Sequence, residues 1–159
     1  MTDLAQLFGD KLPAFKELQG APWGRLCHSI GLANLQRHLD GQPLRILDAG
    51  GGNGLEAIPL AAQGHTVALL DLTGEMLAEA RRNAEASGVA GRMAFYQADL
   101  AAIPDLFPEA QFDLVLCHNV LQYAGDLVAA TGAVCHPLRP GGLISVICVN
   151  RYSELIARR

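Results

Sequence analysis

From residue 44 onward, short apolar runs alternate with segments of helical spacing, and this alternation constrains the fold more than any other feature of the chain. Strands that alternate with helices in this way form βαβ units with parallel strands. The sequence therefore predicts an α/β fold: a Rossmann-like, doubly wound, mostly parallel sheet with helices on both faces. The predicted strands cover residues 44–48, 66–70, 92–97, 112–117 and 143–149.

Capping and breaking residues place the predicted helices between these strands. One helix follows a Gly-rich turn and ends near Gln63. The next begins after Thr73, a typical N-cap residue, and ends before Gly88. Another covers 126–136, and the segment 138–142 is expected to be a turn before the fifth strand.

Residues 1–40 follow a different pattern, which predicts helices without strands. Apolar residues at helical spacing indicate one helix over 3–18, broken near Pro13. A second helix is predicted over 25–39, after a loop at 20–22. We therefore divide the chain into N-terminal helices, 1–40, and an α/β core, 41–159.

Composition excludes several classes of protein. The 159 residues carry 12 basic and 16 acidic side chains, a net charge of −4, which argues against a surface devoted to nucleic acid. The sequence contains neither an uninterrupted apolar run of membrane-spanning length nor a signal-peptide pattern at Met1–Leu4. Four cysteines without a CxxC pair predict neither a metal site nor a redox motif and favour the cytosol.

The Gly-rich turn, Asp48-Ala49-Gly50-Gly51-Gly52-Asn53-Gly54, directly follows the first strand. Glycines there let the backbone turn tightly and approach a ligand, and the next helix directs its N-terminal N–H groups toward it. The spacing does not match the dinucleotide fingerprint G-x-G-x-x-G, because counting from Gly50 places Leu55 at the third glycine.

Two further acids end the second and third strands. Asp71 lies where a carboxylate can accept hydrogen bonds from ribose hydroxyls, and Asp99 where one can accept from an exocyclic amine. With Asp48, three acids end three successive strands. Because open α/β sheets bind ligands at the carboxyl ends of their strands, these acids indicate a nucleoside-binding edge.

Over residues 44–149 the chain resembles the class I S-adenosylmethionine-dependent methyltransferases. The resemblance implies that the Gly-rich turn holds the methionine end of the cofactor, Asp71 the ribose, and Asp99 the adenine amine. It also matches 138–142 to the family's turn before the fifth strand and places residues 1–40 on the substrate side, as a cap. The implied cofactor-binding residues are Asp48, Gly50, Gly51, Gly52, Gly54, Asp71, Leu72, Met76, Asp99, Leu100 and His118.

A narrower set of motifs, at 20–39, 64–67 and 117–123, is similar to bacterial methyltransferases that act on 5-carboxymethoxyuridine in tRNA. That resemblance implies that His118 lines the site. It also implies an Arg in the second N-terminal helix that approaches the cofactor carboxylate, but Cys27 stands at the matching position, and Arg25 belongs to another face of the helix. The remaining histidines, at 28, 38, 65 and 136, are expected to be structural.

The resulting hypothesis is methyl transfer from S-adenosylmethionine to an oxygen acceptor, such as a carboxylate, or to a nitrogen, on a modified tRNA uridine or a small molecule. No catalytic residue is assigned, because a carboxylate acceptor is already ionised at neutral pH and needs no general base. Two alternatives stay open: a non-catalytic cofactor-binding scaffold or regulator, and a nicotinamide-dependent oxidoreductase.

The fifth strand, 143–149, is apolar and carries neither charge nor Pro, the usual protections of an edge strand. The family continues beyond this point into a further helix and two more strands, whereas only ten residues follow Val149 here. We expect either that the core is incomplete at its C-terminus, which we favour, or that the edge supports self-association.

Overall fold

The computed structural model describes residues 12–148 and contains one sheet of five parallel strands in the order β3-β2-β1-β4-β5. The α/β, doubly wound, parallel fold predicted from the sequence is confirmed. The strands are β1 (Arg45–Ala49), β2 (Thr66–Asp71), β3 (Met93–Gln97), β4 (Phe112–His118) and β5 (Leu138–Ile147).

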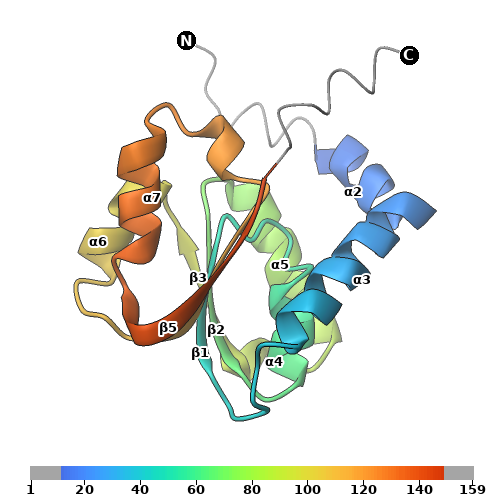
Figure 1. The fold of residues 1–159 in the computed structure, drawn as a ribbon. Helices are drawn as coiled ribbons and strands as arrows, with labels where there is room; N and C mark the ends of the chain where they lie inside the picture. The colour runs from blue at the N-terminus through green and yellow to red at the C-terminus, as the bar shows by residue number, and fades with distance from the viewer. Residues whose placement is uncertain (1–11, 149–159) are drawn as a thin grey trace.

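Helices cover both faces of the sheet (Figure 1). One face carries α3 (Pro22–Gln36), α4 (Ala57–Ala62) and α5 (Gly74–Ala86), with α2 (Leu12–Gly20) packed against α3. The other face carries α6 (Ile103–Leu106) and α7 (Leu127–Cys135). Three short 3-10 helices complete the connections: η1 (Ala90–Arg92), η2 (Leu100–Ala102) and η3 (Leu121–Tyr123).

Successive residues of the central strands supply two separate apolar clusters, because side chains alternate between the faces of a sheet. In β1, Ile46 belongs to the cluster under α3, α4 and α5, and Leu47 to the cluster under α6 and α7. In β4, Leu114 and Val115 divide in the same way, and both are fully buried. Burial on both faces explains the continuous apolar sequence of these strands.

Two predicted boundaries were wrong. Helix α3 begins at Pro22, within the predicted loop, because proline at the first helical positions needs no hydrogen-bonded N–H. Strand β5 begins at Leu138, inside the predicted turn 138–142, because the register shifts between Phe112 and Leu114 and a bulge accommodates the two glycines.

The described N-terminal segment agrees in part with the prediction. Helix α2 begins at Leu12, so Pro13 lies in its first turn, where proline is tolerated. The rest of the predicted helix 3–18 lies outside the described residues, as do Val149 and the helix start expected after β5.

Strand β5 forms one edge of the described sheet, as expected. Three of its apolar side chains, Leu143, Ile144 and Val146, are 40–46% exposed. The apolar edge is therefore present, and self-association through it stays a prediction. Within residues 12–148, no helix has the length and apolar character needed to cross a bilayer.

Because the central strands are buried on both faces, shortening one of their side chains should leave a cavity and destabilise the protein. Leu114→Ala should lower the free energy of unfolding by about 2–5 kcal/mol, because Leu114 is fully buried in the cluster under α3–α5. Leu18→Ala makes the same change in a side chain that is 67% exposed and should shift stability by about 0.5 kcal/mol or less. Urea unfolding of both variants measures the difference, and equal losses would contradict the assignment of the core.

Candidate functional site

A cavity of about 950 Å³ opens at the carboxyl ends of the strands. Its wall includes Gly50 after β1, Asp71 at the end of β2, Ala98 after β3 and His118 at the end of β4. This is the edge at which open α/β sheets bind ligands, and the volume lies near the upper end of the usual range for ligand pockets, about 300–1,000 Å³.

The glycine turn lies against β2 and forms the floor of the cavity. The N–H groups of Gly50 and Gly51 donate to the carbonyl of Leu70, at 2.7 and 3.1 Å. Gly50 has φ +80°, and a Cβ there would lie 2.3 Å from Cγ2 of Val120. Gly52 has φ +53°, and the nearest atom to a Cβ there is Sδ of Met76, at 4.0 Å. The backbone is therefore packed tightly at Gly50 and open to a ligand at Gly52.

The carboxylate of Asp71 joins the glycine turn to the start of α5. Its Oδ2 accepts the N–H of Gly52 at 2.9 Å, and its Oδ1 accepts the N–H of Thr73 at 2.8 Å. Burial raises the pKa of Asp71, and the hydrogen bonds from Thr73 and Gly52 oppose that rise. Each oxygen retains a lone pair, so Asp71 can accept further bonds from a hydroxyl pair in the cavity.

Asp48, the first acid of the glycine motif, lies beneath the turn and does not line the cavity. Only 2% of it is exposed, and its Oδ2 has no hydrogen-bond partner. Burial raises the pKa of Asp48 well above its usual range, and the nearby carboxylates of Glu56 and Asp71 raise it further. A Cβ at Gly51 would lie 2.5 Å from this carboxylate, so Gly51 lets the turn close over Asp48.

Four further predicted cofactor-binding residues line the wall. Leu72 lies in the β2–α5 connection, Met76 in the first turn of α5, and Asp99 and Leu100 follow β3. The Oδ1 of Asp99 accepts the N–H of Ala101 at 2.9 Å, which fixes the side chain at the start of η2. Of the predicted cofactor-binding residues, Asp48 and Gly54 alone do not line the cavity.

Sequence reasoning missed one group of residues in the wall. Glu56, before α4, is held by His28 of α3, whose Nδ1 lies 2.7 Å from Oε1 of Glu56. His118 lies on the other side, with its Nδ1 3.9 Å from the same oxygen. His28 and His136, both expected to be structural, line the cavity. An acid two residues beyond Gly54 was a visible signal, whereas nothing in the spacing pointed to His28.

His65 has the structural role that was expected of it. It is 4% exposed, and its Nδ1 accepts the N–H of Leu44 at 3.0 Å. On α3, Cys27 is exposed, and Arg25 donates to the carbonyl of Gly20, away from the cavity wall. Neither residue supplies a cation to the described site.

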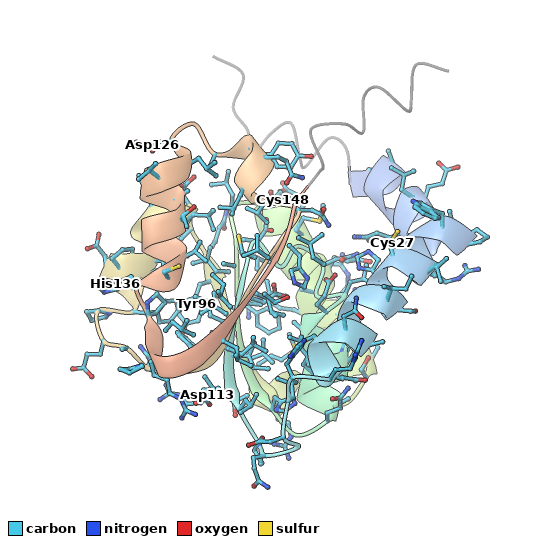
Figure 2. The ribbon with its side chains drawn as sticks, in the orientation of Figure 1. Cys27, Tyr96, Asp113, Asp126, His136 and Cys148 are labelled. Carbon is cyan, nitrogen blue, oxygen red and sulfur yellow. The ribbon has the colours of Figure 1, made fainter. Side chains whose placement is uncertain are left out.

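The charged side chains in the wall of the cavity are acidic. The described lining of the cavity contains four carboxylates and no lysine or arginine; the four are Glu56, Asp71, Asp99 and Asp126. Arg45 and Arg139 lie in the first residues of β1 and β5, at the opposite edge. Asp113, which pairs with Arg139, lies at this opposite edge, and Figure 2 shows it far from Asp126.

Comparison with known proteins matches residues 46–142 to a family described as "Methyltransferase domain". The chain therefore belongs to this family, the class I S-adenosylmethionine-dependent methyltransferases.

Individual relatives differ in the acceptor they modify. Over 157 residues the chain is 34% identical to tRNA 5-carboxymethoxyuridine methyltransferase of Escherichia coli K12, covering 97% of this chain and 58% of that protein. Over 151 residues it is 34% identical to ubiquinone biosynthesis O-methyltransferase of Xylella fastidiosa, and the match covers 89% of this chain and 58% of that protein. The chain thus spans just over half the length of these curated relatives.

The fold matches solved methyltransferase structures. Magnesium protoporphyrin IX methyltransferase from Synechocystis, solved with bound S-adenosylmethionine, superposes with a TM-score of 0.70 at 20% identity, covering 87% of this chain and 73% of that one. At this identity the match supports the fold alone.

The close packing of Gly50 against Val120 predicts that an alanine at position 50 destabilises the protein for two separate reasons. Gly50→Ala should destabilise the protein by about 1–2 kcal/mol for the positive φ and by a further ~1–3 kcal/mol for the overlap. Gly88 has φ +70° and open space around it, so Gly88→Ala should show only the destabilisation caused by the positive φ. Val120→Ala combined with Gly50→Ala should recover most of the excess in thermal unfolding. An equal cost at Gly50 and Gly88 would contradict the packing.

Proposed function

We propose that this cavity binds S-adenosylmethionine and that the protein transfers its methyl group to an acceptor oxygen. The observation that carries the proposal is that Gly52, Asp71 and Asp99, which follow or end three neighbouring strands, line one cavity. Their chemistry suits a nucleoside attached to an amino-acid chain: open backbone at Gly52, a hydroxyl acceptor at Asp71 and an amine acceptor at Asp99.

When bound, S-adenosylmethionine supplies an electrophilic methyl group on a sulfonium, so the protein must mainly orient the two reactants and exclude water. Gly52 lets the backbone approach the ligand without a side chain between them. Asp71 fixes that backbone through the Gly52 N–H and orients the ribose hydroxyls. Leu72 and Met76 provide an apolar wall for the adenine.

The charge distribution favours an uncharged small molecule as acceptor. The four carboxylates in the described lining oppose the approach of a polyanion, whereas Val120, Tyr123 and Ala124 give the wall beside His118 an apolar character. Tyr123 is 44% exposed and Leu127, the first residue of α7, 56%. An apolar acceptor with a hydroxyl group suits this surface: as the bond from sulfur to the methyl group breaks and the oxygen–methyl bond forms, the hydroxyl proton would pass to a histidine of the wall or to water. The Xylella relative is named as an O-methyltransferase.

A modified tRNA uridine is the second candidate. It is favoured by the similarity to the Escherichia coli enzyme, which extends over 97% of this chain. The carboxylate of such a uridine is ionised at neutral pH and would attack the methyl group without a general base. This agrees with the wall of the cavity, because Nε2 of His118 is hydrogen-bonded to Ser145 and is not free to act as a base.

We also propose that residues 1–40 act as a cap on the acceptor side of a cofactor-binding core formed by 41–159. Gln19 of α2 and His28 of α3 both line the cavity. In addition, Oε1 of Gln19 accepts a hydrogen bond from Nδ2 of Asn53 in the glycine turn, at 2.9 Å. The cap and the core thus meet at the proposed methionine end.

The role of Asp71 predicts a loss of cofactor affinity. Asp71→Ala should weaken binding of S-adenosylhomocysteine by about 10- to 150-fold, the equivalent of ~1.5–3 kcal/mol for hydrogen bonds to a charged group. Asp105→Ala, an exposed acid of α6 outside the cavity, should leave the affinity unchanged. Titration calorimetry on both variants tests this, and an unchanged affinity of Asp71→Ala would remove Asp71 from the site.

Turnover tests the function directly. The protein should release S-adenosylhomocysteine from S-adenosylmethionine when supplied with small phenols and catechols, and not when supplied with total tRNA. Transfer to tRNA alone would reverse the choice of acceptor. Cofactor binding without turnover on either class would favour a scaffold, and binding of a nicotinamide dinucleotide in its place would favour an oxidoreductase.

A further inference from the structure

Asn119, the first residue after β4, has a left-handed backbone conformation. Among residues 12–148, it alone of the non-glycine residues has a positive φ, +57°. This conformation strains a residue that has a side chain, whereas glycine adopts it freely. The turn itself has a structural purpose, because it returns the chain so that Val120 packs against Gly50. Glycine would serve that purpose without strain, so the side chain at position 119 calls for a reason of its own.

The side chain of Asn119 does not stabilise its own turn. Asparagine in this conformation usually hydrogen-bonds to the backbone nearby. Here other groups hold the turn: the N–H of Asn119 donates to the carbonyl of Ile147 at 2.7 Å, and the carbonyl of Asn119 accepts from Nε2 of Gln122 at 3.0 Å. The carboxamide makes no hydrogen bond with the part of the chain that the structure describes. Asn119 is exposed and lines the cavity, so this carboxamide is available to a ligand.

The order of the strands places Asn119 on the acceptor side of the cavity. The strands run outward from β1 to β3 in one direction and from β4 to β5 in the other, and open α/β sheets bind ligands where the order reverses. Asp71 and Asp99, which we propose hold the nucleoside, belong to the β2 and β3 side of this point, whereas Asn119 follows β4 on the other side. A cofactor whose nucleoside lies over β2 and β3 leaves the wall after β4 to the acceptor.

The chemistry of a carboxamide limits what Asn119 can do there. As the acceptor oxygen bonds to the methyl group and the bond from sulfur to the methyl group breaks, the hydroxyl proton passes to a histidine of the wall or to water. A carboxamide does not titrate, so it takes no part in that proton transfer and supplies hydrogen bonds alone. Its oxygen accepts and its NH₂ donates, which suits a neighbouring group of the acceptor that does both, such as a second hydroxyl.

We propose that Asn119 determines specificity for the acceptor: its carboxamide hydrogen-bonds a second polar group that lies next to the hydroxyl being methylated. The inference rests on the proposed function and narrows its acceptors to those with two adjacent polar groups. An acceptor whose second group lies elsewhere on the ring loses this hydrogen bond, and it should therefore be methylated less efficiently.

The test compares 2-hydroxyphenol with 4-hydroxyphenol, which differ only in the position of the second hydroxyl. The wild-type protein should have the higher kcat/KM for 2-hydroxyphenol. In Asn119→Gly the ratio of the two kcat/KM values should fall about three- to tenfold, as expected for the loss of one neutral hydrogen bond. The intrinsic reactivity of each phenol is the same with both proteins and cancels in this comparison. Asn119→Asp keeps an oxygen acceptor in a residue that tolerates the same φ, so it should keep the ratio within about twofold.

Two further measurements distinguish this role from a structural one. Asn119→Gly should unfold thermally close to the wild-type temperature, because relief of the strain offsets the added freedom of glycine in the unfolded chain. It should also bind S-adenosylhomocysteine within about twofold of the wild type. Gly88→Asn is a matched control: it places asparagine at φ +70° in open space outside the cavity wall, and it should leave the ratio of kcat/KM values unchanged.

The outcomes separate the two proposals. If the wild-type protein binds no S-adenosylhomocysteine, the proposed function fails and this inference with it. If it binds the cofactor product but methylates neither isomer, or methylates tRNA alone, the inference is overturned while cofactor binding stands. If it methylates both isomers and Asn119→Gly lowers both kcat/KM values equally or not at all, the inference is overturned while the proposed function stands. An equal fall of the ratio in Asn119→Gly and Asn119→Asp would also overturn it.

Discussion

The carboxylate of Asp71 is the interaction on which the site depends. It ends a buried strand, yet both of its oxygens accept backbone N–H groups, one from Gly52 in the turn after β1 and one from Thr73 at the start of α5. A single side chain therefore joins the two loops, in addition to the bonds from Gly50 and Gly51 to Leu70 and from Asn83 of α5 to the carbonyl of Asn53. Because hydrogen bonds to a charged group are stronger than neutral ones, this arrangement makes a glycine-rich turn rigid enough to bind a ligand.

The parallel sheet determines where this side chain can act. In a parallel sheet all carboxyl ends meet at one edge, so Asp71, Asp99 and His118 reach the same cavity from three strands. The arginines at the first residues of β1 and β5 are held at the other edge for the same reason. The topology thus gathers the carboxylates of the cavity at one edge, opposite Arg45 and Arg139.

Much of this was readable in the sequence. The apolar runs from 44 onward predicted five parallel strands, since strands buried on both faces are continuously apolar. The acids at 71 and 99 were correctly placed at strand ends, and all but two of the predicted cofactor-binding residues line the cavity. Local signals sufficed there because each residue follows its own strand directly.

The rest depends on contacts between segments that are distant in sequence. His28 and Glu56 are 28 residues apart, and only the packing of α3 beside α4 brings them together. The strand start at Leu138 depends on pairing with β4 through a bulge, which a turn-like Pro-Gly-Gly sequence does not indicate. Asp48 likewise matches the motif, and only the three-dimensional structure reveals that it lies beneath the turn rather than in the wall.

The most direct measurement of the central claim is a crystal structure of the protein with S-adenosylhomocysteine. The account predicts the ribose hydroxyls within hydrogen-bond distance of Asp71, the adenine between Met76 and Leu100, and the thioether sulfur over Gly52. A nucleoside bound elsewhere, or one bound in the cavity with its ribose away from Asp71, would contradict it.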